Sequence, residues 1–194
     1  MYSSKQQREF EREALPHWEA LYSFAAYLCR DRELAKDLVQ DTFTRAWENW
    51  KSFQPGTNCK AWLFKILRNL YINHYRRLRR TPELLSYDEH PDDEDSFPEL
   101  PASPSVETEF YKTVLDEEVV EALYALPESF RTIVILCDLE EFSYEDVANM
   151  LGIPIGTVRS RLHRARIRLA ALLFHYAQQR GWVSPESPSA NHGD

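Results

Sequence analysis

Apolar residues in residues 10–80 recur at spacings of three and four positions, which is the period of one face of an α-helix. Three such faces can be identified. They comprise Leu21, Phe24, Ala25 and Leu28; Leu38, Thr42, Phe43, Ala46 and Trp47; and Leu63, Ile66, Leu67 and Leu70. The breaks between them fall near residues 29–31 and at QPGTN (54–58), a typical turn sequence. No stretch alternates convincingly with the period of two that marks a β-strand, so the pattern predicts helices throughout.

The helical period is interrupted over residues 82–105 and returns near Val106. The interrupted segment, PELLSYDEHPDDEDSFPELPASPS, holds five prolines and no Lys or Arg. Prolines at this density are incompatible with a helix, and the acidic side chains repel one another. We therefore expect a solvated linker between two helical parts.

Residues 143–169, SYEDVANMLGIPIGTVRSRLHRARIRL, have the form of a helix-turn-helix. Ser143 stands at an N-cap with Asp146 three positions on, and Gly152 and Pro154 end one helix and begin the next. One side of the second helix can pack on the first. It carries Val158, Leu162, Ala165 and Leu169. The opposite side can enter a DNA major groove. It carries Ser160, His163, Arg164 and Ile167, flanked by Arg159.

These patterns predict an all-α protein with two small helical domains joined by a flexible acidic linker. We place the domains at residues 10–81 and 113–176. The linker then covers residues 82–112, and a disordered tail covers residues 177–194.

Positive charge is concentrated in two segments of a chain of 194 residues whose net charge is -8. Residues 152–169 hold five arginines and no acid, and Arg can read guanine edges in the major groove. Residues 60–80 hold seven Lys or Arg, no acid, and interleaved aromatic rings. Rings stack on unpaired bases while cations hold phosphates, so this segment is typical of a single-strand site. We expect Trp50 and Phe53, beside the turn, to serve that site, and the rings of Phe64 and Tyr71 to belong to the core.

The remaining chemistry is sparse. The sequence has no glycine-rich phosphate loop and no carboxylate pair or nucleophile motif, which argues against an enzyme. Cys29, Cys59 and Cys137 are far apart and lack zinc spacing, so we expect thiols in a reducing compartment and neither a metal nor another cofactor. A redox role of Cys59 stays open, because a nearby Lys60 would lower its pKa. No secretory leader or long apolar run occurs, so we expect a cytoplasmic protein.

At these motifs the sequence resembles the extracytoplasmic-function (ECF) sigma factors of the sigma-70 family. The resemblance covers about residues 10–80 and 110–175. It is carried by DLVQDTFTRAW (37–47), CKAWLFKILRNLYINHYRR (59–77) and ALPESFRTIVILCDLEEFSYEDVANMLGIPIGTVRSRLHRAR (125–166). The phrases EREALPHWEALYSFA and FQPGTNCKAWLFKIL resemble the branch that answers thiol-oxidative stress.

The resemblance implies that the first domain is sigma region 2. One helix face would meet the clamp of the largest subunit of core RNA polymerase. The residues assigned to it are Asp37, Gln40, Asp41, Thr44 and Arg45. The loop 50–60 and the following helix would bind the -10 promoter element as a single strand. The residues assigned to it are Trp50, Phe53, Asn58, Lys60, Lys65, Arg68, Asn73, Arg76 and Arg77.

The second domain would be sigma region 4, which the resemblance places on the flap of the second-largest subunit and on the -35 element. The residues assigned to DNA are Arg159, Ser160, His163 and Arg164. The linker would replace region 3. The resemblance also implies an anti-sigma factor as a partner, which binds zinc in the thiol-stress branch.

The sequence therefore predicts a sigma factor that binds core RNA polymerase, recognises two promoter elements and promotes promoter melting, for a stress regulon under anti-sigma control. The alternative is a stand-alone helix-turn-helix regulator that dimerises through residues 10–80 and binds a palindrome. That alternative predicts tight DNA binding without polymerase and leaves the polar face of residues 37–48 unexplained.

Overall fold

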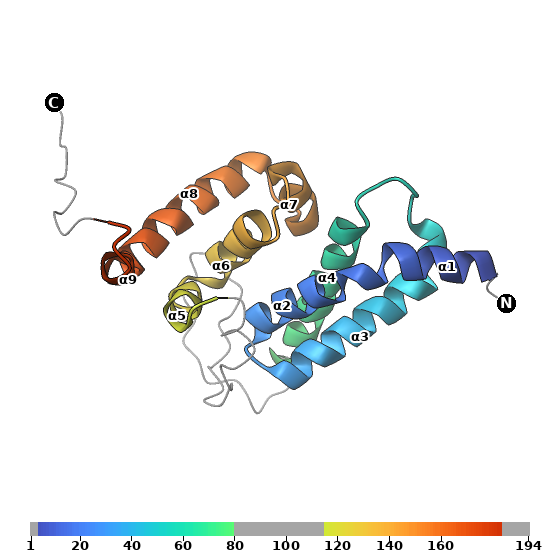
Figure 1. Ribbon diagram of the computed structural model, residues 1–194. Coiled ribbons are helices and arrows are strands. Elements are labelled where there is room, and N and C mark those ends of the chain that lie inside the picture. Colours follow the sequence, from blue (N-terminus) through green and yellow to red (C-terminus); the bar gives the residue numbers. More distant parts are fainter. Residues whose placement is uncertain (1–3, 80–114, 184–194) are drawn as a thin grey trace.

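The computed structural model describes residues 4–79 and 115–183 (Figure 1). The expected acidic linker, residues 82–112, lies outside the described residues. All regular structure within the two described ranges is helical and none of it is β-strand, which confirms the all-α prediction.

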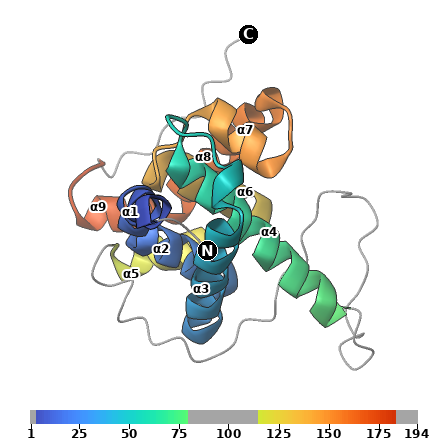
Figure 2. The same cartoon turned by 90° about the vertical axis from the view of Figure 1, so that its right-hand side faces the viewer.

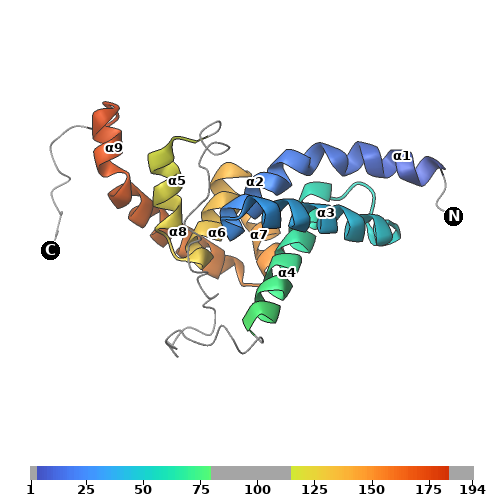
Figure 3. The ribbon, with the colours of Figure 1, turned by 90° about the horizontal axis from the view of Figure 1, so that it is seen from below.

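The first domain is a bundle of three main helices with a helical N-terminal arm. Its elements in chain order are α1 (Ser4–Glu13), η1 (Leu15–His17), α2 (Trp18–Cys29), α3 (Arg32–Glu48), η2 (Trp50–Ser52) and α4 (Cys59–Arg79). Helices α2, α3 and α4 pack on one another (Figure 3). Leu21, Phe24, Leu63 and Leu67 are at most 1% exposed, so the predicted apolar faces do form the core.

Local chemistry explains where these helices begin and end. Cys29 ends α2, and Arg30 follows with a φ of 53° in the left-handed region. Asp31 then caps α3, because its carboxylate accepts hydrogen bonds from the backbone N–H groups of Glu33 and Leu34 at 2.9 and 3.1 Å. The predicted break near residues 29–31 is confirmed.

The second domain contains the predicted helix-turn-helix. Its elements are α5 (Glu117–Tyr124), α6 (Glu128–Val134), the π-helical turn η5 (Ile135–Leu139), α7 (Tyr144–Leu151), α8 (Ile155–Leu172) and α9 (Phe174–Gln179). The Ser143 hydroxyl accepts a hydrogen bond from the Asp146 backbone N–H at 3.1 Å, and Gly152, at a φ of 69°, ends α7. Val158, Leu162 and Ala165 of α8 are buried, as the pattern predicted.

The two domains pack against each other and share one continuous apolar core. Helix α4 lies beside α7, and the rings of Phe64 and Phe142 meet edge to face at 5.0 Å (Figures 1 and 2). Helix α8 lies on the side of the second domain that is far from α3 (Figure 1).

Ordered structure extends past residue 177, where we expected the tail to begin. Helix α9 runs to Gln179, and the side chains of Tyr176 and Arg180 both bind the Asp116 carboxylate just before α5. The indole of Trp182 also packs edge-on against Tyr176, with ring centroids 5.7 Å apart. The rest of the expected tail, residues 184–194, lies outside the described residues. None of the helices in the described part of the chain is long and apolar enough to span a bilayer.

Candidate nucleic-acid and polymerase interface

The outer face of α3 presents polar side chains at helical spacing. Asp37, Gln40, Asp41, Thr44 and Arg45 are all exposed. The opposite face is buried, and the Thr42 hydroxyl there donates a hydrogen bond to the Leu38 carbonyl at 2.7 Å. The structure thus brings the five expected polymerase contacts together on one surface. A face of mixed charge suits a polar, reversible protein interface.

Trp50 and Phe53 do not present their rings to solvent. Each residue is 7% exposed, and the two rings stack at a centroid distance of 4.8 Å. Phe10 of α1 packs edge-on against Trp50 at 5.0 Å, and Trp62 of α4 lies 5.2 Å from Phe53. The short η2 turn folds both rings inward onto these neighbours. This differs from our expectation that both rings serve a base-binding site, because in this structure they belong to the core.

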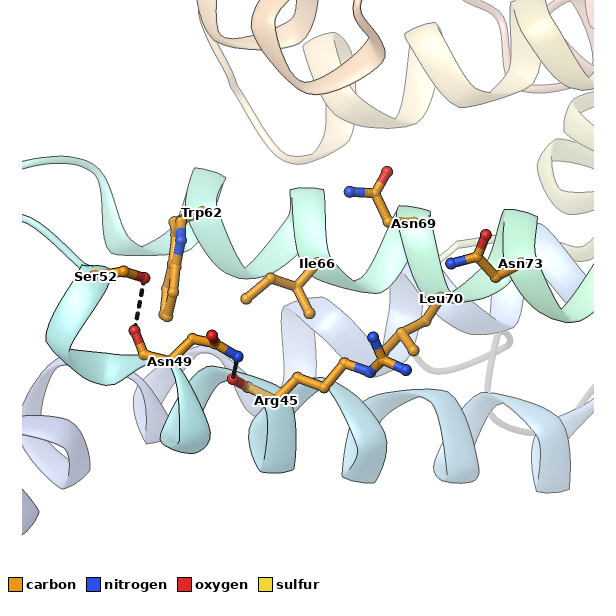
Figure 4. A pocket seen from close by; sticks show the side chains of 8 residues that line it. All are labelled: Arg45, Asn49, Ser52, Trp62, Ile66, Asn69, Leu70 and Asn73. Atoms are coloured by element: carbon orange, nitrogen blue, oxygen red, sulfur yellow. Dashed lines mark hydrogen bonds between the residues drawn. The ribbon is translucent and has the colours of Figure 1, made fainter. Parts of the chain in front are cut away.

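A cavity of about 280 Å³ lies between the end of α3 and α4 (Figure 4). Its walls combine amide and hydroxyl groups with an indole and aliphatic side chains. The lining residues are Arg45, Asn49, Ser52, Trp62, Ile66, Asn69, Leu70 and Asn73. This size is close to the lower end of small-ligand pockets, about 300 Å³. An apolar, partly aromatic wall with a few amides is a chemistry that can hold a flat heterocycle.

Hydrogen bonds order the α3 end of this cavity. The Asn49 side-chain amide donates to the Arg45 carbonyl at 2.8 Å, and the Ser52 hydroxyl donates to the Asn49 carbonyl at 2.7 Å (Figure 4). Of the lining residues, the sequence predicted only Arg45 and Asn73 as site residues, and it placed them in different interfaces. A signal for the cavity was present in the sequence but missed. Residues spaced by four, three and four positions form one stripe of α4, in which two amides follow an aromatic and an aliphatic side chain: Trp62, Ile66, Asn69 and Asn73.

The structure divides the expected DNA-binding residues of α4 between two sides of the helix. Lys65, Asn73, Arg76 and Arg77 are exposed. Lys60 and Arg68 are half-buried and contact the second domain. The Lys60 ammonium lies 2.8 Å from the Glu140 carboxylate, and the Arg68 guanidinium donates to the Met150 carbonyl at 3.4 Å. Burial lowers the pKa of Arg68.

Asn58 stands at the start of α4 and acts locally as a cap. Its side-chain oxygen accepts a hydrogen bond from the Ala61 backbone N–H at 3.1 Å, and the residue is exposed. Asn58 does not line the cavity.

The expected reading face of α8 is exposed. Arg159, Ser160, His163 and Arg164 all reach solvent. The Arg164 Nε donates to the Ser160 carbonyl at 3.3 Å, and its guanidinium lies 5.8 Å from the centre of the Phe130 ring. Arg168 lies over the same ring at 5.1 Å. One aromatic ring of α6 therefore orders two arginines of α8.

The three thiols are buried or half-buried. Burial raises the pKa of Cys59 to about 11, and the nearby Glu13 carboxylate acts in the same direction. Burial also raises the pKa of Cys29 to about 12 and that of Cys137 to about 11. The Cys59 thiol is therefore shifted away from the thiolate, which is opposite to the direction expected from a neighbouring Lys60. Among the described residues, no three His, Cys, Asp or Glu side chains gather into a metal site.

Comparison with known proteins identifies the family to which the two domains belong. The family profile of Sigma-70 region 2 matches residues 16–81, and that of Sigma-70, region 4 matches residues 116–169. The chain is similar to the ECF RNA polymerase sigma factor EcfG of Rhodopseudomonas palustris, with 41% identity over 80% of each chain. It is also 34% identical to the ECF RNA polymerase sigma factor SigE of Mycolicibacterium smegmatis, over 86% of this chain and 65% of that one.

Solved structures agree with these matches. The sigma factor RpoE of Bartonella quintana, in complex with the anti-sigma factor NepR, aligns with a TM-score of 0.67 and 37% identity over 86% of this chain and 98% of that one. CnrH in complex with the cytosolic domain of CnrY aligns with a TM-score of 0.60 and 26% identity over 87% of this chain and 90% of that one. The chain belongs to the ECF sigma factors of the sigma-70 family. Its relatives are sigma factors, which are not enzymes.

Proposed function

We propose that this ECF sigma factor uses the α3–α4 cavity to hold a base of the -10 promoter element, α8 to read the -35 element, and the outer face of α3 to bind core RNA polymerase. The observation that carries the proposal is the cavity itself. It joins the end of the polar α3 face to the exposed cationic side of α4.

The cavity offers an unstacked base both stacking and hydrogen bonds. Removing a base from the duplex costs a few kcal/mol, which an aromatic surface and amide contacts can offset. Trp62 supplies the ring, and Asn49 and Asn69 supply side-chain amides. Because this compensation is available only to an unpaired base, the site favours an open duplex.

The exposed part of α4 then guides the strand to and from the cavity. Lys65, Arg76 and Arg77 can bind phosphates, and Asn73 belongs both to this surface and to the cavity. Trp50 and Phe53 contribute indirectly, since their buried rings support Trp62.

Helix α8 supplies the duplex-reading surface. Its exposed residues face away from the buried Val158 and Leu162, as a recognition helix in the major groove requires. Arg164 and Arg159 are suited to guanine edges, and Ser160 and His163 to bases or phosphates. The second domain would also meet the flap of the second-largest polymerase subunit, as the family resemblance predicts.

We infer further that an anti-sigma factor controls this chain. The supporting observation is that one solved relative, the sigma factor RpoE of Bartonella quintana, is in complex with the anti-sigma factor NepR. That this partner binds zinc, that the regulon answers thiol-oxidative stress, and that the protein is cytoplasmic stay predictions. The buried thiols favour sensing by the partner over sensing by this chain.

Promoter-directed transcription tests the proposal. The purified chain is added to bacterial core polymerase with a library of genomic fragments, and RNA 5′ ends are mapped. We expect initiation at sites that share two spaced motifs, and weaker dependence on the upstream motif with Arg164→Ala. If the chain neither binds core polymerase nor redirects initiation, but protects duplex DNA alone, the stand-alone regulator replaces the sigma function.

A further inference from the structure

The second domain holds the Lys60 ammonium of α4 from several directions. The ammonium lies 2.8 Å from the Glu140 carboxylate and donates to the Glu140 backbone carbonyl at 3.0 Å. It also lies 4.9 Å from the centre of the Phe142 ring and 5.6 Å from that of Phe64. The side chains of Lys60 and Glu140 are only 26% and 11% exposed, so this ion pair is largely shielded from water.

An unusual backbone brings Glu140 to this position. It follows the π-helical turn η5, and its N–H donates to the Ile135 carbonyl at 2.9 Å. The next residue, Glu141, has a φ of 58°, which side-chain-bearing residues rarely adopt. Beyond it, the Phe142 N–H donates to the Leu136 carbonyl at 3.0 Å. π-Turns and left-handed non-glycine residues concentrate at functional sites, where the surrounding contacts maintain them.

Other contacts extend the same interface on both sides. The rings of Phe64 and Phe142 meet at 5.0 Å, and the Arg68 guanidinium reaches the Met150 carbonyl. Farther along, the Tyr124 hydroxyl donates to the Ala26 carbonyl at 3.3 Å. In the Lys60 and Arg68 contacts, the first domain supplies the cation and the second domain supplies the acceptor. The interface therefore combines one ion pair with hydrogen bonds to backbone carbonyls and an aromatic contact.

This packed arrangement is incompatible with simultaneous contact to two separated promoter elements. Elements centred about 25 base pairs apart are about 85 Å apart along the duplex at 3.4 Å per pair. Helices α4 and α7 are in direct contact. The domains must separate before α4 and α8 can bind their elements together, and only then are Lys60 and Arg68 released from their contacts with Glu140 and Met150.

We propose that Glu140 and Phe142 form an intramolecular latch that holds the two domains together in the free chain. The Glu140 carboxylate pairs with the Lys60 ammonium there, and a DNA phosphate replaces that carboxylate when the domains separate. The assignment of the phosphate rests on the proposed function, whereas the latch itself does not. The latch sets how readily polymerase or an anti-sigma factor can separate the two domains.

Charge reversal at each side of the ion pair tests the latch in the full-length chain without DNA or polymerase. The variants are Lys60→Glu, Glu140→Lys and the double exchange. Glu141→Lys is the matched control, because it makes the same charge change at the neighbouring, exposed residue. Rotational correlation times from ¹⁵N relaxation are measured separately for the helices of each domain, and circular dichroism checks that each variant is folded.

In the unmodified chain and in Glu141→Lys, we expect one correlation time for both domains. In each single reversal, the two domains should tumble separately, with correlation times about twofold shorter because each moving body has about half the mass. The double exchange should restore most of the common value. Separate tumbling in the unmodified chain, or a common correlation time in both folded single reversals, would overturn the latch.

A transcription readout separates this inference from the proposed function. At limiting core polymerase, Glu140→Lys should raise promoter-directed initiation relative to the unmodified chain. If no variant directs initiation but the relaxation results are as expected, the proposed function fails and the latch stands. If the unmodified chain directs initiation but single reversals leave the domains coupled, the latch fails and the function stands.

Discussion

Arg166 of α8 and Asp138 of the π-helical turn form a two-bonded ion pair. The Arg166 Nη2 lies 2.5 Å from Asp138 Oδ1, and its Nε donates to Oδ2 at 3.2 Å. The hydrogen bond to the Asp138 carboxylate raises the pKa of Arg166 further above the neutral range. Arg166 is therefore held by a carboxylate within the domain, whereas the exposed Arg164, two positions earlier, contacts the Ser160 carbonyl and the face of the Phe130 ring and has no such ion pair within the described part of the chain.

This difference predicts distinct effects of two arginine substitutions. Arg164→Ala should reduce discrimination at one base pair of the -35 element by about 1–3 kcal/mol, because a guanidinium that reads a base edge is lost. Arg166→Ala should leave base preference unchanged and lower stability by less than about 1 kcal/mol, since water reaches both partners of its ion pair. Transcription from a library of randomised -35 elements measures the first effect, and thermal melting measures the second. Equal loss of base preference in both variants would contradict the assignment.

The α3–α4 cavity predicts a role for an asparagine that is absent from the sequence-derived set. Asn69→Ala should reduce open-complex formation about tenfold, the equivalent of one hydrogen bond of about 1.4 kcal/mol to the captured base. Affinity for core polymerase should not change, because Asn69 lies outside the exposed face of α3. Permanganate reactivity of unpaired thymines reports opening, and a binding titration with labelled core polymerase reports affinity.

Gln54→Ala is the matched control for the cavity. Gln54 carries an exposed amide in the loop between η2 and α4 but does not line the cavity. It should therefore support normal promoter opening. An equal loss with Gln54→Ala would place the captured base at the loop rather than in the cavity.

Periodicity and capping chemistry were sufficient to predict much of the fold. The buried faces of α2, α4 and α8, the Ser143 cap and the Gly152 helix end all depend on residues within a few positions of one another. Such local relations are visible in a single sequence. The exposure of the α3 face follows from the same period, since its polar residues lie opposite Leu38 and Ala46.

The positions of Trp50, Phe53, Lys60 and Arg68 depend instead on contacts between distant parts of the chain. The rings turn inward because Trp50 packs against Phe10 of α1 and Phe53 packs against Trp62 of α4. A helical wheel separates Lys60 from Lys65, yet it does not reveal that a loop about 80 positions later supplies Glu140. The cavity likewise combines the end of one helix with the middle of another.

The environment of Cys137 predicts a pH dependence of its alkylation. Burial and the neighbouring Asp138 carboxylate raise its pKa to about 11, while Arg166 acts in the opposite direction. Since iodoacetamide reacts with the thiolate, the rate should rise about tenfold per pH unit from pH 7 to 10 without levelling off. Peptide mapping by mass spectrometry gives the rate at Cys137 itself. In urea, the rate should level off near the ordinary thiol pKa of about 8.5.

Two substitutions test the direction in which each neighbouring charge shifts the pKa of Cys137. Asp138→Asn removes an anion that opposes thiolate formation, so the rate at pH 8 should increase. Arg166→Ala removes a cation that favours the thiolate, so the rate should decrease. A plateau below pH 9 in the folded chain, verified by circular dichroism, would refute the raised pKa.

Asp116 connects the two ends of the second domain and predicts a stabilising role for α9. Its carboxylate accepts hydrogen bonds from the Tyr176 hydroxyl and the Arg180 guanidinium, and it stands immediately before α5. Asp116→Asn retains the size of the side chain but loses the charge that both donors share. The melting temperature of the second domain should therefore fall by a few degrees. We call the contacts of Tyr176 and Arg180 with Asp116 the clasp. Faster hydrogen exchange in α9 than in α7 would show that the loss of stability begins at the clasp.

Glu118→Gln provides the control for Asp116→Asn, because it removes the same charge two positions later, in the first turn of α5 and outside the hydrogen bonds from Tyr176 and Arg180 to Asp116. Its melting temperature should stay near that of the unmodified chain. Tyr176→Phe and Arg180→Gln should each produce part of the Asp116→Asn effect, and the double variant should approach the whole of it. If both of these variants melt like the unmodified chain while Asp116→Asn does not, Asp116 stabilises α5 as an N-terminal anion rather than through α9. The two mechanisms are thus separable, because the clasp requires the C-terminal partners and the helix dipole does not.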